Sequence, residues 1–219
     1  MTSSTSTDSR QLRRVLQRHS ITLPDPQVDR LAAYCQQLWS WNERLNLTRH
    51  TDFEAFVTRD LVDSLRLENH LPPDCTVLDV GSGGGVPGLV LAIVRPDLSV
   101  SLAESVAKKA KALTAITQEL KLPVPVYAER AESLLKARHF GVLTIRAVAS
   151  LRKLLFWFQQ QGKSFDRMLL IKGPRWSQEL EEAEEQGLVQ NVRVEKIDQY
   201  RSPGHDNDSV ILSVQFGRK

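Results

Sequence analysis

The chain has 219 residues, of which 41% are hydrophobic and 25% are charged, and its formal net charge is +3. This composition predicts a globular protein with one substantial core, excludes a fibrous or disordered chain, and permits a polyanionic partner without requiring one. Its two cysteines lack metal-ligand spacing, and its apolar runs are far shorter than the roughly 20 residues of a membrane helix, so we expect no disulfide framework, no metal, no membrane segment and a cytoplasmic location.

Residues 1–70 predict a helical extension. The first nine residues are polar and are expected to be disordered, and helical periodicity begins near Arg10, again at Asp25, and a third time behind a cap at Thr51 or Asp52. One face of the first helix collects the arginines at positions 10, 13, 14 and 18, which either meet the phosphates of a polyanion or form a solvated basic face. Two tryptophans, at 39 and 41, share the apolar periodicity of the second helix and are expected in the core.

The next stretch reads as strand, glycine loop, helix and strand. Residues 76–80 form a short β-favouring run that enters a loop with glycines at 81, 83 and 85, and an apolar helix over 86–94 precedes a second strand over 98–103. Gly81, Gly83 and Gly85 permit positive φ and let a ligand approach the backbone beside Val86. Glu104 ends the second strand, about 20 residues past the glycines, where a carboxylate can accept hydrogen bonds from both ribose hydroxyls. The pattern predicts a nucleotide-type cofactor site.

The glycine pattern alone leaves the cofactor open. Residues 83–88 satisfy the dinucleotide fingerprint G-x-G-x-x-G, and a ligand-free turn is a further alternative. Asp79 just before Gly81, together with the glycine spacing, suits S-adenosylmethionine better than NAD. A two-domain dehydrogenase would also need a substrate domain after this unit, for which little chain remains.

The remaining elements continue an α/β pattern. Ser105 is expected to cap a helix with Val106 on its apolar face and lysines at 108, 109 and 111, followed by strands over 124–128, 142–145 and 168–171 with a helix over 150–160 between the last two. Arg146 stands at the carboxyl end of the 142–145 strand, where open α/β sheets bind ligands, and it can pair with a cofactor carboxylate, with a phosphate or in a structural ion pair. An acidic helix over 177–186, expected to face water, precedes β runs over 192–200 and 209–216.

Several ordered segments carry a family resemblance. They are LDVGSGGGVPG at 78–88, IVRPD at 93–97 with the following Glu104-Ser105 pair, WNERLNLT at 41–48, LVDSL at 61–65, ELKL at 119–122, TIRAVASL at 144–151 and IKG at 171–173. In this order they resemble the bacterial ribosomal RNA small-subunit methyltransferase G family, also called the glucose-inhibited division protein B family. Proteins of that family methylate nitrogen-7 of one guanine in small-subunit (16S) ribosomal RNA with S-adenosyl-L-methionine as the donor.

The resemblance implies a fold and a set of site residues. The fold is a Rossmann-like S-adenosylmethionine-dependent methyltransferase domain over 71–219, with a mostly parallel sheet and a reversed last strand. The implied cofactor-binding residues are Gly81, Gly83, Gly85, Val86, Glu104, Ala131, Glu132 and Arg146, where the counterparts of Ala131 and Glu132 contact the adenine end. Lys172 and Arg175 are candidates for RNA contact, with a solvated loop as the alternative.

The same resemblance sets the expected partners and mechanism. The partner is small-subunit ribosomal RNA or its ribonucleoprotein particle, and we expect the protein to act as a monomer. Guanine nitrogen-7 carries a free lone pair, so no general base is needed and no catalytic residue is assigned, and none of the five histidines falls into a nucleophile-base or metal spacing. Asp60 departs from the family, since many members have histidine there. A small-molecule methyltransferase and a non-catalytic, S-adenosylmethionine-responsive RNA-binding module remain alternatives.

Overall fold

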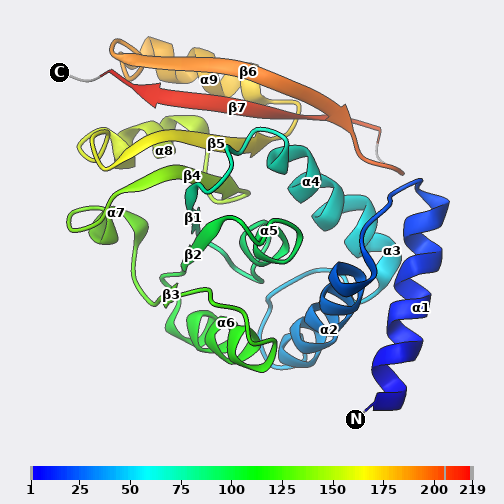
Figure 1. The fold of residues 1–219 in the computed structure, drawn as a ribbon. Helices are drawn as coiled ribbons and strands as arrows, with labels where there is room; N and C mark the ends of the chain where they lie inside the picture. Colours follow the sequence, from blue (N-terminus) through cyan, green and yellow to red (C-terminus); the bar gives the residue numbers. More distant parts are fainter. Residues whose placement is uncertain (1, 205, 218–219) are drawn as a thin grey trace.

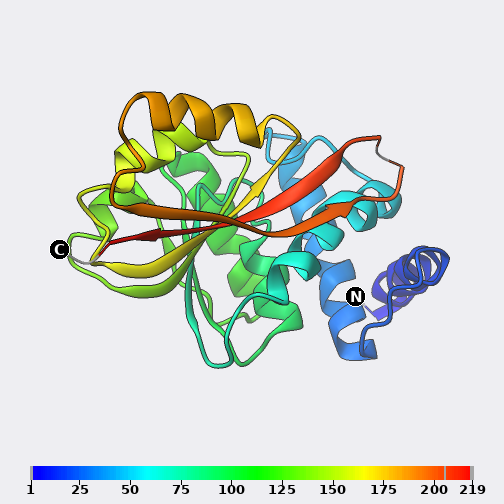
Figure 2. The same cartoon turned by 90° about the horizontal axis from the view of Figure 1, so that it is seen from above.

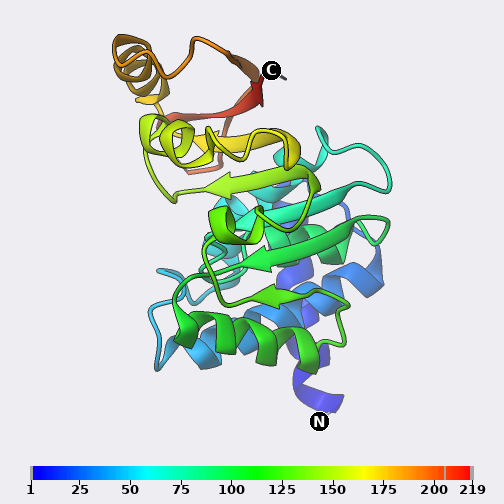
Figure 3. The same ribbon diagram turned by 90° about the vertical axis from the view of Figure 1, so that its left-hand side faces the viewer.

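A seven-stranded sheet forms the centre of the molecule. The computed structural model describes residues 2–204 and 206–217. Across the sheet the strand order is β3-β2-β1-β4-β5-β7-β6, seen as a stack in Figure 3. The strands are β1 (Thr76–Val80), β2 (Ser99–Ala103), β3 (Val126–Tyr127), β4 (Phe140–Arg146), β5 (Phe165–Lys172), β6 (Val192–Arg201) and β7 (Asp208–Phe216). The pairs among β1 to β5 are parallel, whereas β7 runs antiparallel to both β5 and β6. The predicted α/β fold with a reversed last strand is confirmed.

Helices cover both faces of this sheet because its central strands are apolar on both sides. Successive residues of a strand point to opposite faces, and accordingly Val77 packs with α5 (Gly88–Val94) and α6 (Ala107–Glu119), while Leu78 packs with α7 (Ala131–Leu134) and α8 (Leu151–Phe158). The last helix, α9 (Trp176–Glu185), lies beside α8 (Figure 1). Near-continuous hydrophobic strands are what a parallel sheet buried on both faces requires.

The N-terminal helices join the core on the α5 side. They are α1 (Thr2–Arg18), α2 (Asp25–Asn42), α3 (Phe53–Ala55), the π-helical turn η1 (Phe56–Leu61) and α4 (Val62–Glu68). Leu12 of α1, Leu31 of α2 and Leu67 of α4 are fully buried and belong to the same apolar cluster as α5 and α6. These helices therefore complete the main core. A division into parts 1–70 and 71–219 stays a prediction.

Helix starts differ from the sequence expectations at two points and agree with them at a third. The first helix already begins at Thr2, before the expected Arg10. As predicted, Asp52 caps α3, accepting the amide of Ala55 at 2.8 Å. The expected Ser105 cap is wrong, because α6 begins at Ala107 behind Val106, whose amide is bound by the Glu104 carboxylate at 2.8 Å. Held in this turn, Val106 is 49% exposed instead of lying on an apolar face.

The two strands at the end of the chain form a long hairpin that extends past the sheet toward α4 (Figure 2). Asp198 of β6 accepts a hydrogen bond from Arg66 of α4 at 2.7 Å, and the Arg66 guanidinium lies over the ring of Tyr200. His205, one of the five histidines, lies outside the described residues, as does Met1. Among the helices within 2–204 and 206–217, none has the length and apolarity needed to cross a membrane.

Candidate functional site

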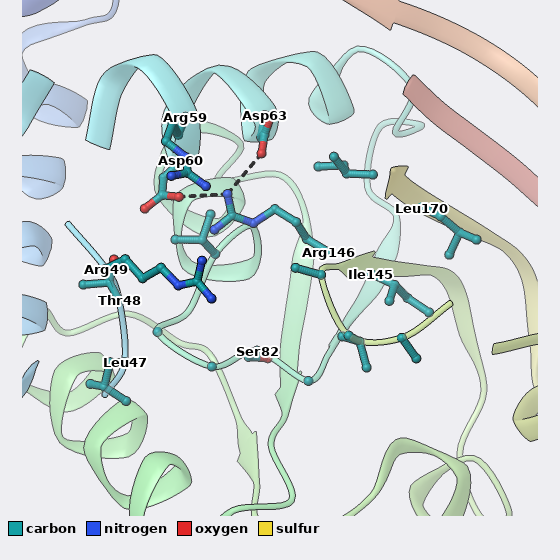
Figure 4. Close-up of a pocket in the computed structure, with 18 of the residues that line it drawn as sticks. Leu47, Thr48, Arg49, Arg59, Asp60, Asp63, Ser82, Ile145, Arg146 and Leu170 are labelled. Carbon is teal, nitrogen blue, oxygen red and sulfur yellow. Dashed lines mark hydrogen bonds and ion pairs between the residues drawn. The ribbon is translucent and has the colours of Figure 1, made fainter. Parts of the chain in front are cut away.

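A cavity of about 1250 Å³ opens at the carboxyl ends of β1, β4 and β5 (Figure 4). One wall is the glycine loop after β1, and the loop 146–149 after β4 forms a second. The helical extension supplies a third, from loop 46–50 and from Arg59, Asp60 and Asp63. This is the edge at which open α/β sheets bind ligands. Segments far apart in the sequence thus meet at one site.

The glycine loop folds back on the end of β2. The amide of Gly81 donates to the carbonyl of Ala103 at 2.8 Å, and Gly81, Gly83 and Gly85 all have positive φ, as expected. Above Gly83 the space is open, since the nearest atom to an added Cβ is the Gly81 carbonyl oxygen at 3.8 Å. Gly81, Gly83 and Val86 line the cavity. A ligand can therefore approach the backbone at Gly83 without meeting a side chain.

Gly85 has a packing function behind the loop. A Cβ at this position would lie 2.7 Å from Cδ1 of Leu89 on α5, and Gly85 lies outside the cavity lining. The missing side chain lets α5 approach the loop. Direct contact of Gly85 with a cofactor stays a prediction.

Glu104 is held at the rim of the cavity by two amides. Its Oε2 accepts from Gly83 at 2.9 Å and its Oε1 accepts from Val106 at 2.8 Å, while the side chain is buried. Each carboxylate oxygen has further lone-pair capacity. The fixed carboxylate can therefore also accept hydrogen bonds from a vicinal diol in the cavity.

Asp79 lies beneath the glycine loop in the sheet. Its side chain is buried, and its Oδ1 accepts from the Thr144 hydroxyl at 3.1 Å. Burial raises the pKa of Asp79 to about 6, although hydrogen bonds from Ser82, Thr144 and the Gly88 amide oppose the rise. The buried side chain that packs beneath the glycine loop is therefore a carboxyl group that changes its charge near pH 6.

Arg146 enters the cavity from the end of β4 and pairs with the helical extension. Its Nη1 lies 2.8 Å from Oδ1 of Asp60 and 3.1 Å from Oδ2 of Asp63, and the hydroxyl of Tyr200 donates to Oδ1 of Asp63 at 2.7 Å. Burial disfavours the charge, but the two carboxylates outweigh it and raise the pKa of Arg146. Burial and the Asp63 carboxylate likewise raise the pKa of Tyr200. The structural ion pair, left open by the sequence, is formed, and Arg146 still lines the cavity.

Asp60 thus has a defined partner in this chain. It is 4% exposed, lies on η1 and lines the cavity as well as pairing with Arg146. An imidazole at this position would lack the full negative charge that balances a buried guanidinium. The departure from histidine at this position is therefore accompanied by an ion pair inside the site.

Lys172 lines the cavity but is engaged internally. Its Nζ donates to the carbonyl of Ala149 at 2.8 Å and lies 2.5 Å from Oε2 of Glu179, which also accepts the amide of Leu151 at 2.7 Å. Glu179 belongs to the acidic α9, so the expectation that this helix simply faces water is wrong at this residue, which lines the cavity. Lys172 thus connects the end of β5 to the loop before α8 and to α9. Its contact with RNA stays a prediction.

Three other predicted residues lie outside the cavity lining. Ala131 and Glu132 begin α7, where Ala131 is buried and Glu132 is half-buried. Arg175 is exposed in the loop before α9. An adenine contact by the first pair and an RNA contact by Arg175 remain predictions.

Two of the four arginines on the predicted basic face of α1 are paired with carboxylates. Arg13 forms ion pairs with Asp25 at 3.2 Å and Asp29 at 3.1 Å, and Arg18 pairs with Glu54 at 2.6 Å. The simpler alternative, in which this face does not bind a polyanion, gains support from these contacts.

The cavity residues of the helical extension that sequence reasoning missed include Arg49, His50 and Arg59. They follow WNERLNLT and precede LVDSL, so the signal was the placement of two family-like segments on either side of them. Burial lowers the pKa of His50, which favours a neutral imidazole. Across 2–204 and 206–217, His, Cys, Asp and Glu side chains form no cluster of three that could hold a metal.

Comparison with known proteins gives consistent matches along the chain. A family model described as rRNA small subunit methyltransferase G matches residues 27–207. A ribosomal RNA small subunit methyltransferase G from Rhodopirellula baltica is 47% identical over 185 residues, covering 84% of this chain and 80% of the relative. One from Desulfotalea psychrophila is 35% identical over 209 residues, covering 92% and 96%. The solved structure of MtNAS in complex with MTA and tNA has a TM-score of 0.58 at 15% identity over 85% of this chain and 70% of that one, and shows a shared fold.

Proposed function

Because the chain belongs to the rRNA small subunit methyltransferase G family, we propose that it transfers a methyl group from S-adenosylmethionine to nitrogen-7 of a guanine in small-subunit ribosomal RNA. The observation that carries the proposal is the Glu104 carboxylate, fixed by the Gly83 amide beside an open backbone surface at the cavity rim. This arrangement offers a ribose-binding acid next to a backbone that a ligand can reach.

The cavity residues fit such a cofactor. Glu104 would hold the ribose, and the loop from Gly81 to Val86 would lie against the donor. Arg146, whose Nη1 is paired with Asp60 and Asp63, also lines the cavity and would bind the methionine carboxylate. The Glu104 carboxylate is held by two uncharged backbone amides, so its negative charge favours a cationic ligand beside the glycine loop. Adenine contact by Ala131 and Glu132 is part of the proposal, since both follow β3 at this edge of the sheet.

Bound S-adenosylmethionine supplies an electrophilic methyl group on a sulfonium sulfur. The chain must align this donor with the base and exclude water, because the transfer is an in-line displacement. The amide-held Glu104 and the doubly paired Arg146 are rigid enough for that task. Since guanine nitrogen-7 has no proton to lose, no cavity side chain has to accept one.

The direct test is to map nitrogen-7 methylguanosine in small-subunit ribosomal RNA from cells with and without the gene. We expect one modified guanine that disappears with the gene. Purified protein should then methylate small-subunit RNA or its particle, and assaying both substrates separates them. Methylation of metabolites instead would indicate a small-molecule methyltransferase, and RNA binding that responds to the cofactor without transfer would indicate a non-catalytic module.

The pH dependence tests the mechanism. Single-turnover methylation at saturating RNA and cofactor should change little across the neutral range, whereas a required base would make the rate rise about tenfold per pH unit below its pKa. We also propose that the protein is monomeric and cytoplasmic, which light scattering and cell fractionation check.

A further inference from the structure

The cavity is larger than one cofactor needs. Pockets for small molecules usually measure about 300–1000 Å³, whereas this cavity has about 1250 Å³. Among the residues that line the cavity, those with a proposed cofactor role lie on the glycine loop and the ends of β2 and β4. The remaining part is lined by loop 46–50 and η1 of the helical extension, together with the end of β5 and Glu179 of α9.

This remaining part presents two guanidinium groups, those of Arg49 and Arg59. Both arginines are exposed and line the cavity, and in Figure 4 Arg49 reaches in from its loop while Arg59 lies beside Asp60. Within the part of the chain that the structure describes, neither side chain has a hydrogen bond or an ion pair. Other arginines of the protein, such as Arg13, Arg66 and Arg146, are paired with carboxylates. Arg49 and Arg59 therefore keep their donors available to a ligand.

The local charges favour an anion at these two side chains. Asp60 and Asp63, the carboxylates on the same wall, are already paired with Arg146, and Lys172 is neutralised by Glu179. Lys109, on α6, also lines the cavity. Guanidinium groups bind phosphate oxygens through two parallel hydrogen bonds, which gives both affinity and orientation.

We propose that Arg49 and Arg59 form a phosphate-binding subsite that holds the RNA backbone at the target nucleotide. This subsite rests on the proposed function. It adds a position for the phosphate of the target nucleotide, on the helical extension across the cavity from the glycine loop. The π-helical turn η1 presents Arg59 to the ligand and the next residue, Asp60, to Arg146. Two neighbouring residues of η1 would thereby contact the phosphate and the Arg146 side chain of the cofactor site, respectively.

The test uses the full chain with Arg49→Ala, Arg59→Ala and the control Arg44→Ala. Arg44 is also exposed, lies just before the same loop and lies outside the cavity lining. Binding of small-subunit RNA is measured by fluorescence anisotropy over a series of salt concentrations. Each cavity variant should bind RNA roughly tenfold or more weakly. Each should also lower the slope of log affinity against log salt by about 0.7 to 0.9, whereas the control keeps both values.

Two further measurements separate the possible outcomes. Calorimetry should show the same S-adenosylmethionine affinity in all variants, and Arg49→Lys should restore most of the salt slope because it keeps the charge. Wild-type RNA affinity and slope in both alanine variants would overturn the proposal. So would a loss confined to cofactor binding, which would assign the arginines to the methionine carboxylate. If the wild-type protein methylates no ribosomal RNA, the proposed function fails instead, and the RNA-binding slopes still decide the subsite.

Discussion

Replacing Asp79 by asparagine should change how the stability of the protein depends on pH. The carboxyl group is buried beneath the glycine loop, and burial raises its pKa from 3.8 to about 6. In the unfolded chain it is exposed and titrates near its ordinary value. Between about pH 4 and pH 6 the unfolded chain therefore releases a proton that the folded protein keeps.

The sign and size of the effect follow from this difference. The contribution of Asp79 to stability is fully present below about pH 4 and is lost as the pH rises through 6. A displacement from 3.8 to about 6 corresponds to about 3 kcal/mol, at about 1.4 kcal/mol per pH unit. Asparagine keeps the oxygen that accepts from Thr144 and does not titrate. Any cost of its amide group is the same at every pH.

Urea denaturation of both proteins at several values between pH 4 and pH 7.5 measures this prediction. The free energy of unfolding of the wild type minus that of Asp79→Asn should fall by up to about 3 kcal/mol over this range and then stay constant. Taking the difference cancels every other titrating group. A difference that is flat, or that grows with pH, would refute the assignment of a raised pKa to the buried carboxyl group.

Three further predictions concern the glycine loop, the hairpin and α1. Gly83→Arg should abolish S-adenosylmethionine binding in calorimetry, because the new side chain would enter the open space above the loop, and intact binding in a folded variant would move the site elsewhere. Tyr200→Phe should lower the free energy of unfolding by about 1.5–3 kcal/mol in urea, since it removes a hydrogen bond to the Asp63 carboxylate; equal stability would contradict this role. Arg13→Ala should leave the salt slope of RNA binding unchanged because Arg13 pairs with Asp25 and Asp29, and a slope lower by about 0.7 to 0.9 would count against that reading.

The parts of the fold that depend on local patterns could be predicted from the sequence. The strand over 76–80 has the expected bounds, and the positive φ of Gly83 and the position of Glu104 follow from residue types within a single strand-loop-helix-strand unit. The antiparallel β7 was also predictable, because two long β runs joined by a turn have to form a hairpin.

The rest depends on contacts between distant segments. Arg146 and Asp63 are 83 positions apart in the sequence, and the residues around either one do not predict their contact. Arg49 and Arg59 reach the cavity only because the helical extension packs against the sheet, which periodicity does not specify. Glu179 lies in an acidic run that looks solvent-facing, and its tie to Lys172 exists only once α9 is in place.

The contact between the terminal hairpin and α4 bears on the order in which the cavity wall is completed during synthesis. Tyr200 holds Asp63, and Asp198 holds Arg66, so both contacts join the early part of the chain to one of its last strands. A ribosome-bound chain that has emerged only through β5 already contains the glycine loop, Glu104 and Arg146, but Asp63 still lacks its hydrogen bond from Tyr200. Since chains emerge from the N-terminus and domains fold as units, the cavity wall at Asp63 gains this hydrogen bond only once β6 has emerged and joined the sheet.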